Sequence, residues 1–239
     1  MKYIKKSKQE PKSLVNWRTQ EEKANRINYF RMKGDDIWGI FPSKSDKKNE
    51  KSYSKQELWD EYLVKEQGGI CAYCGRRIKN YEDGKPRIEH LKPKSKENKL
   101  TLSYFNMVAV CQGDENPINL HCDAKKGSED INTFPTHKSC EEKFIYKWDG
   151  KIKAKDNNEL VIKDIENLGL NVAKLKIARN SIILKVDTFI EILKKERDEI
   201  GILQEIKKRI NQLQNRQKNV FEEFCFVEVY YLRKKLGTI

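Results

Sequence analysis

Two pairs of cysteines frame the residues of this 239-residue chain that could do chemistry. Cys71 and Cys74 have the spacing of a tight knuckle whose two thiolates can face one cation. Cys111 and Cys122 could complete a tetrahedral site, and His121, next to Cys122, could replace one of the thiolates. We therefore predict a structural zinc ion that holds neighbouring segments together and takes no part in catalysis.

The dipeptide Glu89-His90 lies between the two cysteine pairs and is the candidate catalytic element. Hydrolysis of a phosphodiester needs an activated water, a cation on the phosphate oxygens and a base that accepts a proton near neutral pH. An imidazole, with an ordinary pKa of about 6.5, makes His90 the predicted base. Glu89 and Asp123 offer carboxylate oxygens to Mg²⁺ or Mn²⁺, and Asn106 is predicted to orient the histidine or brace its loop. Each residue alone is more often structural, so their combination with the cysteines carries the prediction.

The chain has a formal net charge of +13, from 49 Lys and Arg residues against 36 Asp and Glu residues. This excess favours a polyanionic partner, and it is strongest beside the candidate site. The predicted nucleic-acid contacts are Arg87, Lys92, Lys94 and Lys96. The alternative for the lysines is an ordinary solvated loop. We expect nucleic acid as the partner, with DNA favoured and RNA an open alternative.

The first residues, Met1–Lys6, are charged and lack the apolar core of a signal peptide, and no later stretch is apolar enough to span a bilayer. We therefore expect a cytoplasmic protein with no membrane partner. In a reducing compartment the six cysteines are expected to be metal ligands and free thiols, not disulfides. The sequence indicates no role for Cys140 or Cys225.

Local patterns predict the elements that position these residues. Ser54–Glu57 has the spacing of a capping box and predicts a helix that Gly68-Gly69 ends, just before the first cysteine pair. Ile78–Leu91 is predicted to be a hairpin, with its turn at Tyr81–Gly84 and its return strand at Pro86–His90. Because adjacent strand residues face opposite sides, we expect this strand to end or twist at its last two residues, so that both reach one phosphate.

The apolar run Asn106–Cys111 is the predicted pairing strand, and the polar segment Gln112–Leu120 is predicted to loop out before Asp123 opens a short helix. From Asn171 onward, apolar residues recur at three- and four-residue steps, which is typical of helices. The expected core positions are Leu175, Ala178, Ile182, Val186, Phe189 and Leu193 in one helix, Leu203, Ile206, Ile210 and Leu213 in a second, and Phe221, Phe224 and Tyr231 in a third.

Together these patterns predict an α+β protein in three parts. Residues 1–54 form a basic N-terminal arm with short helices and a surface loop at Ser43–Ser54. Residues 55–150 form the zinc-stapled core, and residues 151–239 form a C-terminal helical region. The apolar faces of that region are predicted to be bundle core and, secondarily, a docking surface.

Four motifs carry a resemblance to a known family. They are Cys71-x-x-Cys74, Glu89-His90-Leu91-x-Pro93-x-Ser95, Asn106-Met107-Val108-Ala109-Val110-Cys111 and Cys122-Asp123-x-x-Lys126-Gly127. In these motifs the chain resembles the HNH endonucleases, which have a ββα-metal fold, and more narrowly the PtuB-type HNH nucleases of Septu and retron anti-phage systems. Segments at the amino terminus, at Cys140–Ile152 and at Leu170-Asn171 are similar to that group as well.

The resemblance implies a ββα-metal HNH core with Glu89 and Asp123 on the catalytic metal and His90 as general base. It implies Asn106 as the middle asparagine, Lys126 as the residue that closes the motif, and zinc on the four cysteines. The chain has Asp123 where many members have His or Asn, which leaves the choice between Mg²⁺ and Mn²⁺ open. The ten-residue spacer within the second cysteine pair is a further departure.

The function that the sequence favours is a metal-dependent HNH endonuclease, the effector of an anti-phage defence complex. The resemblance implies an ABC/SMC-like ATPase of the PtuA type as partner and, in retrons, a reverse transcriptase with its reverse-transcribed DNA. The alternative is a catalytically silent zinc-binding adaptor that only docks nucleic acid. Glu89-His90 and Asp123 discriminate between the two, because a pure adaptor has no need of a base and two carboxylates.

Overall fold

The computed structural model describes residues 1–44, 53–82 and 86–237, so the predicted loop Ser43–Ser54 and the predicted turn Tyr81–Gly84 lie partly outside the described residues. The helices within the described residues are α1 (Lys12–Lys23), α2 (Gly34–Ile40), α3 (Lys55–Glu57), α4 (Val64–Glu66), α5 (Asp123–Lys126), α6 (Glu159–Asn167), α7 (Ala173–Glu196), α8 (Glu199–Gln214) and α9 (Cys225–Lys235). The strands there are β1 (Arg87–His90), β2 (Met107–Val110), β3 (Phe144–Tyr146) and β4 (Ile152–Ala154).

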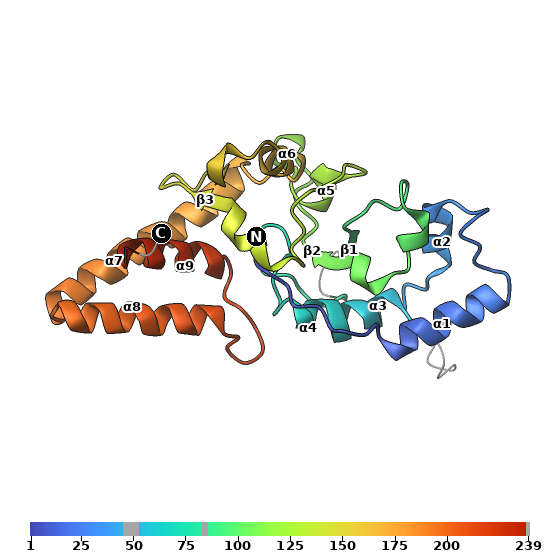
Figure 1. Cartoon of the computed structure of the whole chain (residues 1–239), viewed down its shortest axis with the longest axis horizontal. Coiled ribbons are helices and arrows are strands. Elements are labelled where there is room, and N and C mark those ends of the chain that lie inside the picture. The colour runs from blue at the N-terminus through green and yellow to red at the C-terminus, as the bar shows by residue number, and fades with distance from the viewer. Residues whose placement is uncertain (45–52, 83–85, 238–239) are drawn as a thin grey trace.

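The predicted mixture of helix and sheet is confirmed, since helices accompany two small antiparallel sheets in the described residues. The molecule is elongated (Figure 1). Helices α1 and α2 lie at one end, α7, α8 and α9 lie at the other, and β1 and β2 lie between them. The candidate catalytic residues are therefore in the middle of the molecule.

A helical rod leads into the first cysteine pair. Ser54 Oγ accepts a hydrogen bond from the Glu57 amide at 3.2 Å, which caps α3, and a π-helical turn at Leu58–Leu63 joins α3 to α4. Gly68 and Gly69 have φ angles of +59° and +71°, which favour glycine, and they end the rod. The helix predicted from the capping box is thus confirmed.

The central sheet consists of β1 and β2, with Glu89 opposite Val108 and His90 opposite Met107. β1 ends at His90, so both candidate catalytic residues occupy the last two positions of a strand, as expected. Beyond β2, the side chain of Gln67 takes the place of a further strand, because its amide group donates to the Ala109 carbonyl and accepts from the Ala109 amide, both at 2.7 Å.

The predicted hairpin Ile78–Leu91 is wrong. The described residues 78–82 belong to no strand, whereas the predicted pairing of the return strand with the run Asn106–Cys111 is confirmed, because β1 pairs with β2. Arg77 forms a bridge with Ile70, and the Ile78 amide donates to the Gly69 carbonyl at 3.1 Å. The backbone that was expected to pair with β1 is therefore used to close the turn around the first cysteine pair.

Residues 144–167 form elements that the periodicity does not reveal. β3 and β4 pair antiparallel, and the Asn171 side chain extends the pairing by accepting from the Ile152 amide at 2.8 Å and donating to its carbonyl oxygen at 2.9 Å. Asn158 caps α6 by accepting from the Val161 amide. Strands of three residues are too short to produce a recognisable alternation in sequence.

Helix α9 packs against both α7 and α8. The buried residues of α7 are Leu175, Arg179, Ile183, Val186, Ile190 and Leu193. Of the core positions predicted in α7, Ala178, Ile182 and Phe189 are only partly buried. The difference arises because Arg179 is in the core, where its guanidinium donates to the carbonyl oxygens of Gly150 and Leu170 at 2.6 and 2.7 Å. Leu203 of α8, also predicted to be core, is 37% exposed, and Phe221 and Phe224 precede α9. No helix among the described residues is both long and apolar enough to cross a membrane.

The C-terminal helices contact the cysteine turn directly. The Phe224 amide donates to the Gly75 carbonyl at 3.1 Å. Gly75 has a φ of +80°, and a Cβ at this position would lie 2.3 Å from Cε1 of Phe226, so only glycine fits. The Cys122 amide donates to the Leu168 carbonyl at 2.9 Å. The buried core therefore continues from the cysteine turn into the C-terminal helices.

The N-terminal segment packs against the rest of the molecule and contributes Leu14, Trp17 and Ile37 to the same core. The Lys6 side chain is 9% exposed and donates to the Met107 carbonyl of β2 at 3.0 Å. Its ammonium lies 3.3 Å from a carboxylate oxygen of Glu66 in α4. Burial lowers the pKa of Lys6 to about 8, although the attraction of that carboxylate opposes the shift.

We predict that Lys6 makes stability rise with pH. In the unfolded chain its ammonium has the ordinary pKa of 10.5, so between pH 8 and 10.5 the unfolded state binds more protons than the folded state. Relative to Lys6→Met, the free energy of unfolding of the native protein should rise by about 1 kcal/mol per pH unit in this window. Urea unfolding across the window measures the slopes, with the exposed Lys8→Met as control. Parallel slopes for the native protein and Lys6→Met would contradict the prediction.

Candidate functional site

Three separate segments bring four cysteine sulfurs together. Cys71 Sγ lies 3.7 Å from Cys122 Sγ, Cys74 Sγ lies 3.6 Å from Cys111 Sγ, and all four sulfurs lie within 4.8 Å of one another. Four thiolates at about 2.3 Å from a central zinc ion would be roughly 3.8 Å apart along each edge of the tetrahedron. The cluster is therefore compatible with a zinc ion held by the four predicted cysteines.

Backbone geometry forms this cluster locally. The Gly75 amide donates to the Cys71 carbonyl at 3.0 Å, which closes the first turn. Cys122 has a φ of +55°, a conformation that L-residues rarely adopt, and it immediately precedes α5. Burial raises the pKa of Cys74 and of Cys122 well above the ordinary value for a thiol. A cation beside these thiols would therefore be needed for them to ionise.

His121 lies beside the cluster, but the group that the structure brings together contains the four cysteines without it. Its Nδ1 lies 2.8 Å from the Asn119 carbonyl oxygen. Burial lowers the pKa of His121, but its interactions with Cys111 and Asn119 outweigh burial and raise it. Cys140 and Cys225 are buried thiols outside the four-sulfur group. A tetrahedral site is thus complete with the predicted cysteines alone.

Glu89 is 5% exposed and lies between Lys126 and Tyr73. Lys126 Nζ is 2.7 Å from Glu89 Oε1, and the Tyr73 hydroxyl donates to the same oxygen at 3.2 Å. Burial raises the pKa of Glu89 to about 7, the attraction of Lys126 opposes this rise, and hydrogen bonding with Asp123 adds to it. The carboxylates of Glu89 and Asp123 share this site with one buried cation, Lys126. A divalent ion bound here would offset the remaining negative charge.

His90 is 4% exposed, and the Trp38 indole packs against it in a T-shaped arrangement with ring centroids 4.8 Å apart. His90 Nε2 lies 2.9 Å from the Thr101 carbonyl oxygen. Because a carbonyl can only accept, Nε2 carries the proton of the neutral ring and Nδ1 is left as an acceptor. Burial lowers the pKa of His90 to about 3, with a further contribution from Lys94, so the ring is neutral near pH 7.

Asn106 holds the loop that follows His90. Its side-chain oxygen accepts from the Lys92 amide at 2.8 Å, and its Nδ2 donates to the carbonyl oxygens of Lys92 and Leu100 at 3.0 and 3.2 Å. Its own carbonyl accepts from the Leu91 amide at 2.8 Å. Of the two roles predicted for Asn106, these contacts correspond to bracing the loop.

One cavity of about 320 Å³ brings the candidate catalytic residues together. Glu89 and His90 reach it from the end of β1, and Asp123 and Lys126 reach it from α5. Its other lining residues include Asp35, Trp38, Lys55, Tyr81, Arg87 and Lys94. The N-terminal segment thus forms one wall of the cavity, which the sequence reasoning did not foresee.

The predicted nucleic-acid contacts fall into two groups. Arg87 and Lys94 line the cavity, and they lie 3.6 and 3.3 Å from the carboxylate oxygens of Asp123 and Asp35. Lys92 and Lys96 are not among its lining residues. Asn106 fixes the backbone of Lys92, and the Lys96 ammonium forms a 2.7 Å ion pair with Asp130. Only the first group can meet a ligand inside the cavity.

Sequence reasoning missed Tyr73, Trp38 and Lys55. Tyr73 lies between the two cysteines of the knuckle, so its place beside the site could have been inferred from spacing. Lys55 Nζ lies 4.5 Å from the Trp38 ring centroid, and burial lowers the pKa of Lys55. No local pattern marks Trp38 or Lys55, because tertiary packing brings them to the cavity.

In comparisons with known proteins, no family model and no curated protein matches this chain. The residues of the site and their geometry therefore carry the inference about what this chain does.

We predict about one zinc ion per purified chain. Cys74→Ser should lose this zinc and much of the stability, because thiolate–zinc bonds contribute folding energy directly. Cys140→Ser, at a buried cysteine outside the cluster, should keep its zinc. Elemental analysis of the three proteins gives the metal content. Zinc at the native level in Cys74→Ser would remove that residue from the site.

Proposed function

We propose that this chain is a divalent-metal-dependent HNH endonuclease that hydrolyses phosphodiester bonds of nucleic acid. The observation that carries the proposal is the convergence of Glu89, His90 and Asp123 on one cavity. The order of β1, β2 and α5 beside the four-cysteine cluster supports a ββα-metal core. The net charge of +13 supports a polyanionic substrate.

In this proposal His90 is the general base. The Thr101 carbonyl holds Nε2 and its proton, so Nδ1 takes the proton from the attacking water. The pKa of about 3 ensures that the ring is unprotonated before the reaction. An anionic phosphate in the cavity raises this pKa, because it favours the imidazolium that forms as the water is deprotonated. The bracing contacts of Asn106 keep the loop after His90 in place.

Glu89 and Asp123 are the residues that would hold a catalytic Mg²⁺ or Mn²⁺. When bound, such an ion supplies positive charge to the phosphate oxygens and orients the substrate. Tyr73 and Lys126 fix the position of the Glu89 carboxylate through contacts of 3.2 and 2.7 Å. Lys126 also balances the negative charge of the two carboxylates. Two carboxylates, with substrate oxygens and waters, are the set by which Mg²⁺ is usually held.

Arg87 and Lys94 are the cations best placed to meet a phosphate, because they line the cavity. Their present carboxylate partners are partly or largely exposed, so little free energy is lost when a phosphate replaces them.

The resemblance to PtuB-type nucleases is the basis for the two further parts of the proposal, an ABC/SMC-like ATPase as partner and a role in anti-phage defence.

We predict that His90→Ala lowers the cleavage rate by at least about 100-fold, the usual contribution of a general base. Zinc content and nucleic-acid affinity should be unchanged, because the imidazole contributes to neither. A panel of DNA and RNA substrates with Mg²⁺ or Mn²⁺ provides the assay, and His137→Ala, at an exposed histidine, is the matched control. Cleavage by His90→Ala at the native rate would refute the role, and no cleavage by the native protein would favour the silent adaptor.

We further predict that Asp123→Ala weakens Mn²⁺ binding by more than about 10-fold and abolishes cleavage, because half of the proposed protein ligands are removed. Electron paramagnetic resonance of Mn²⁺ reports binding without any need for activity. Asp114→Ala is the control, since Asp114 pairs with Lys174 and does not line the cavity. Unchanged Mn²⁺ affinity in Asp123→Ala would exclude Asp123 as a ligand.

A further inference from the structure

Phe30 is a large apolar side chain that is left in water: its exposed fraction is 87%. It lies in the turn between α1 and α2, where residues before and after it pack against the core. Ile27 is 4% exposed, and Tyr29 and Met32 contact the core. The turn therefore has an anchor on each side of a ring that points outward.

Two asparagines fix the backbone of this turn. Asn28 Oδ1 accepts from the amides of Phe30 and Arg31 at 3.0 and 3.2 Å. From the neighbouring loop, Asn98 Nδ2 donates to the carbonyl oxygens of Tyr29 and Met32 at 2.5 and 3.2 Å. The Phe30 ring is thus presented from a constrained turn, so little backbone entropy is lost when a ligand contacts it.

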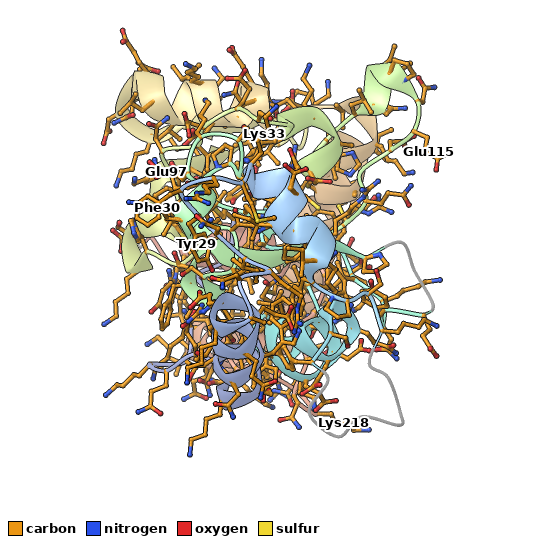
Figure 2. The ribbon with its side chains drawn as sticks, turned by 90° about the vertical axis from the view of Figure 1, so that its right-hand side faces the viewer. Tyr29, Phe30, Lys33, Glu97, Glu115 and Lys218 are labelled. Carbon is orange, nitrogen blue, oxygen red and sulfur yellow. The ribbon has the colours of Figure 1, made fainter. Side chains whose placement is uncertain are left out.

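One cation contacts the ring, and two more lie on the same turn. Lys99 Nζ lies 5.0 Å from the Phe30 ring centroid, and Arg31 and Lys33 are exposed on the same turn. Figure 2 shows Phe30, Tyr29 and Lys33 grouped on the face beside α2, with Glu97 of the neighbouring loop close to them. An aromatic face with cations beside it is the combination that binds a nucleobase and its phosphate together.

The turn is connected directly to the candidate active site. Helix α2 begins four residues after Phe30, and its residues Asp35 and Trp38 line the cavity. Gly34 packs so closely on the loop after β1 that a Cβ there would lie 2.3 Å from the Lys94 carbonyl oxygen. The position of the Phe30 turn relative to the cavity wall is therefore fixed.

We propose that Phe30 is a stacking platform for an unpaired base, and that the nucleic acid is bound as a single strand running from the cavity to this turn. Inside a duplex both faces of a base are covered by its neighbours, so a protein ring can stack only on an unpaired or extruded base. Lys99 meets the phosphate of the stacked nucleotide. This inference rests on the part of the proposed function that makes nucleic acid the ligand, and it is independent of cleavage.

The test measures binding by full-length protein carrying His90→Ala, without added divalent ions, so that no strand is cut. Fluorescence anisotropy gives the affinity for a short single-stranded DNA, the matching RNA and the DNA duplex. Adding Phe30→Ala should weaken single-strand binding by about 10-fold and change duplex binding by less than about twofold. Phe30→Trp should restore single-strand binding, because tryptophan also offers an aromatic face. Trp148→Ala removes another exposed aromatic side chain, far along the chain, and should change neither affinity.

A second readout identifies the contact itself. A strand containing 2-aminopurine at successive positions should show quenching at one of them, and Phe30→Ala should abolish that quenching. The proposal is overturned if Phe30→Ala binds single strands as tightly as its parent, or loses single-strand and duplex binding equally. In the first case the ring belongs to a contact with another protein. If the endonuclease assignment is wrong, the result is different: the native protein binds single strands through Phe30 but cleaves none of them.

Discussion

The position of the Glu89 carboxylate depends on four sulfur atoms that lie within 4.8 Å of one another. Tyr73, which donates to Glu89, lies between two of these cysteines, and Lys126, its ion-pair partner, follows Cys122 by one helical turn. The cysteine cluster thus fixes two of the groups that hold the carboxylate, although the sulfurs themselves do not touch it. A structural metal would in this way determine the geometry of a site at which it takes no chemical part.

Burial shifts the pKa of His90 and of Glu89 in opposite directions, because it disfavours the charged form of each. The histidine is held neutral, and burial raises the pKa of the carboxyl despite a lysine at 2.7 Å. A cavity of this kind favours ligands that bring both signs of charge, such as a metal ion together with a phosphate. Arg87 and Lys94, whose side chains are partly exposed, would attract such a phosphate without adding a fully buried charge.

The sequence allowed the site to be predicted where its residues belong to short local motifs, as the four cysteines, Glu89-His90 and Asp123 do. It failed where packing across the chain decides the structure. The hairpin from Ile78 was wrong because the bridge between Arg77 and Ile70 continues into a hydrogen bond from the Ile78 amide to the Gly69 carbonyl. The core face of α7 was assigned partly to the wrong residues because a buried arginine interrupts the apolar period. Trp38 reaches the cavity from a helix whose sequence gives no such indication.

The contact between Gly75 and Phe226 joins residues that are far apart in the order of synthesis. A ribosome that adds about 5–20 residues per second needs roughly 10–30 s to proceed from one to the other. During that interval the cysteine turn has no helix α9 against it, and the Cys122 amide gains its Leu168 acceptor only after more than half of the interval has passed. The cysteine turn therefore gains its contacts with α9 only after that helix has been synthesised, and a nascent chain that stalls before α9 leaves the turn uncovered.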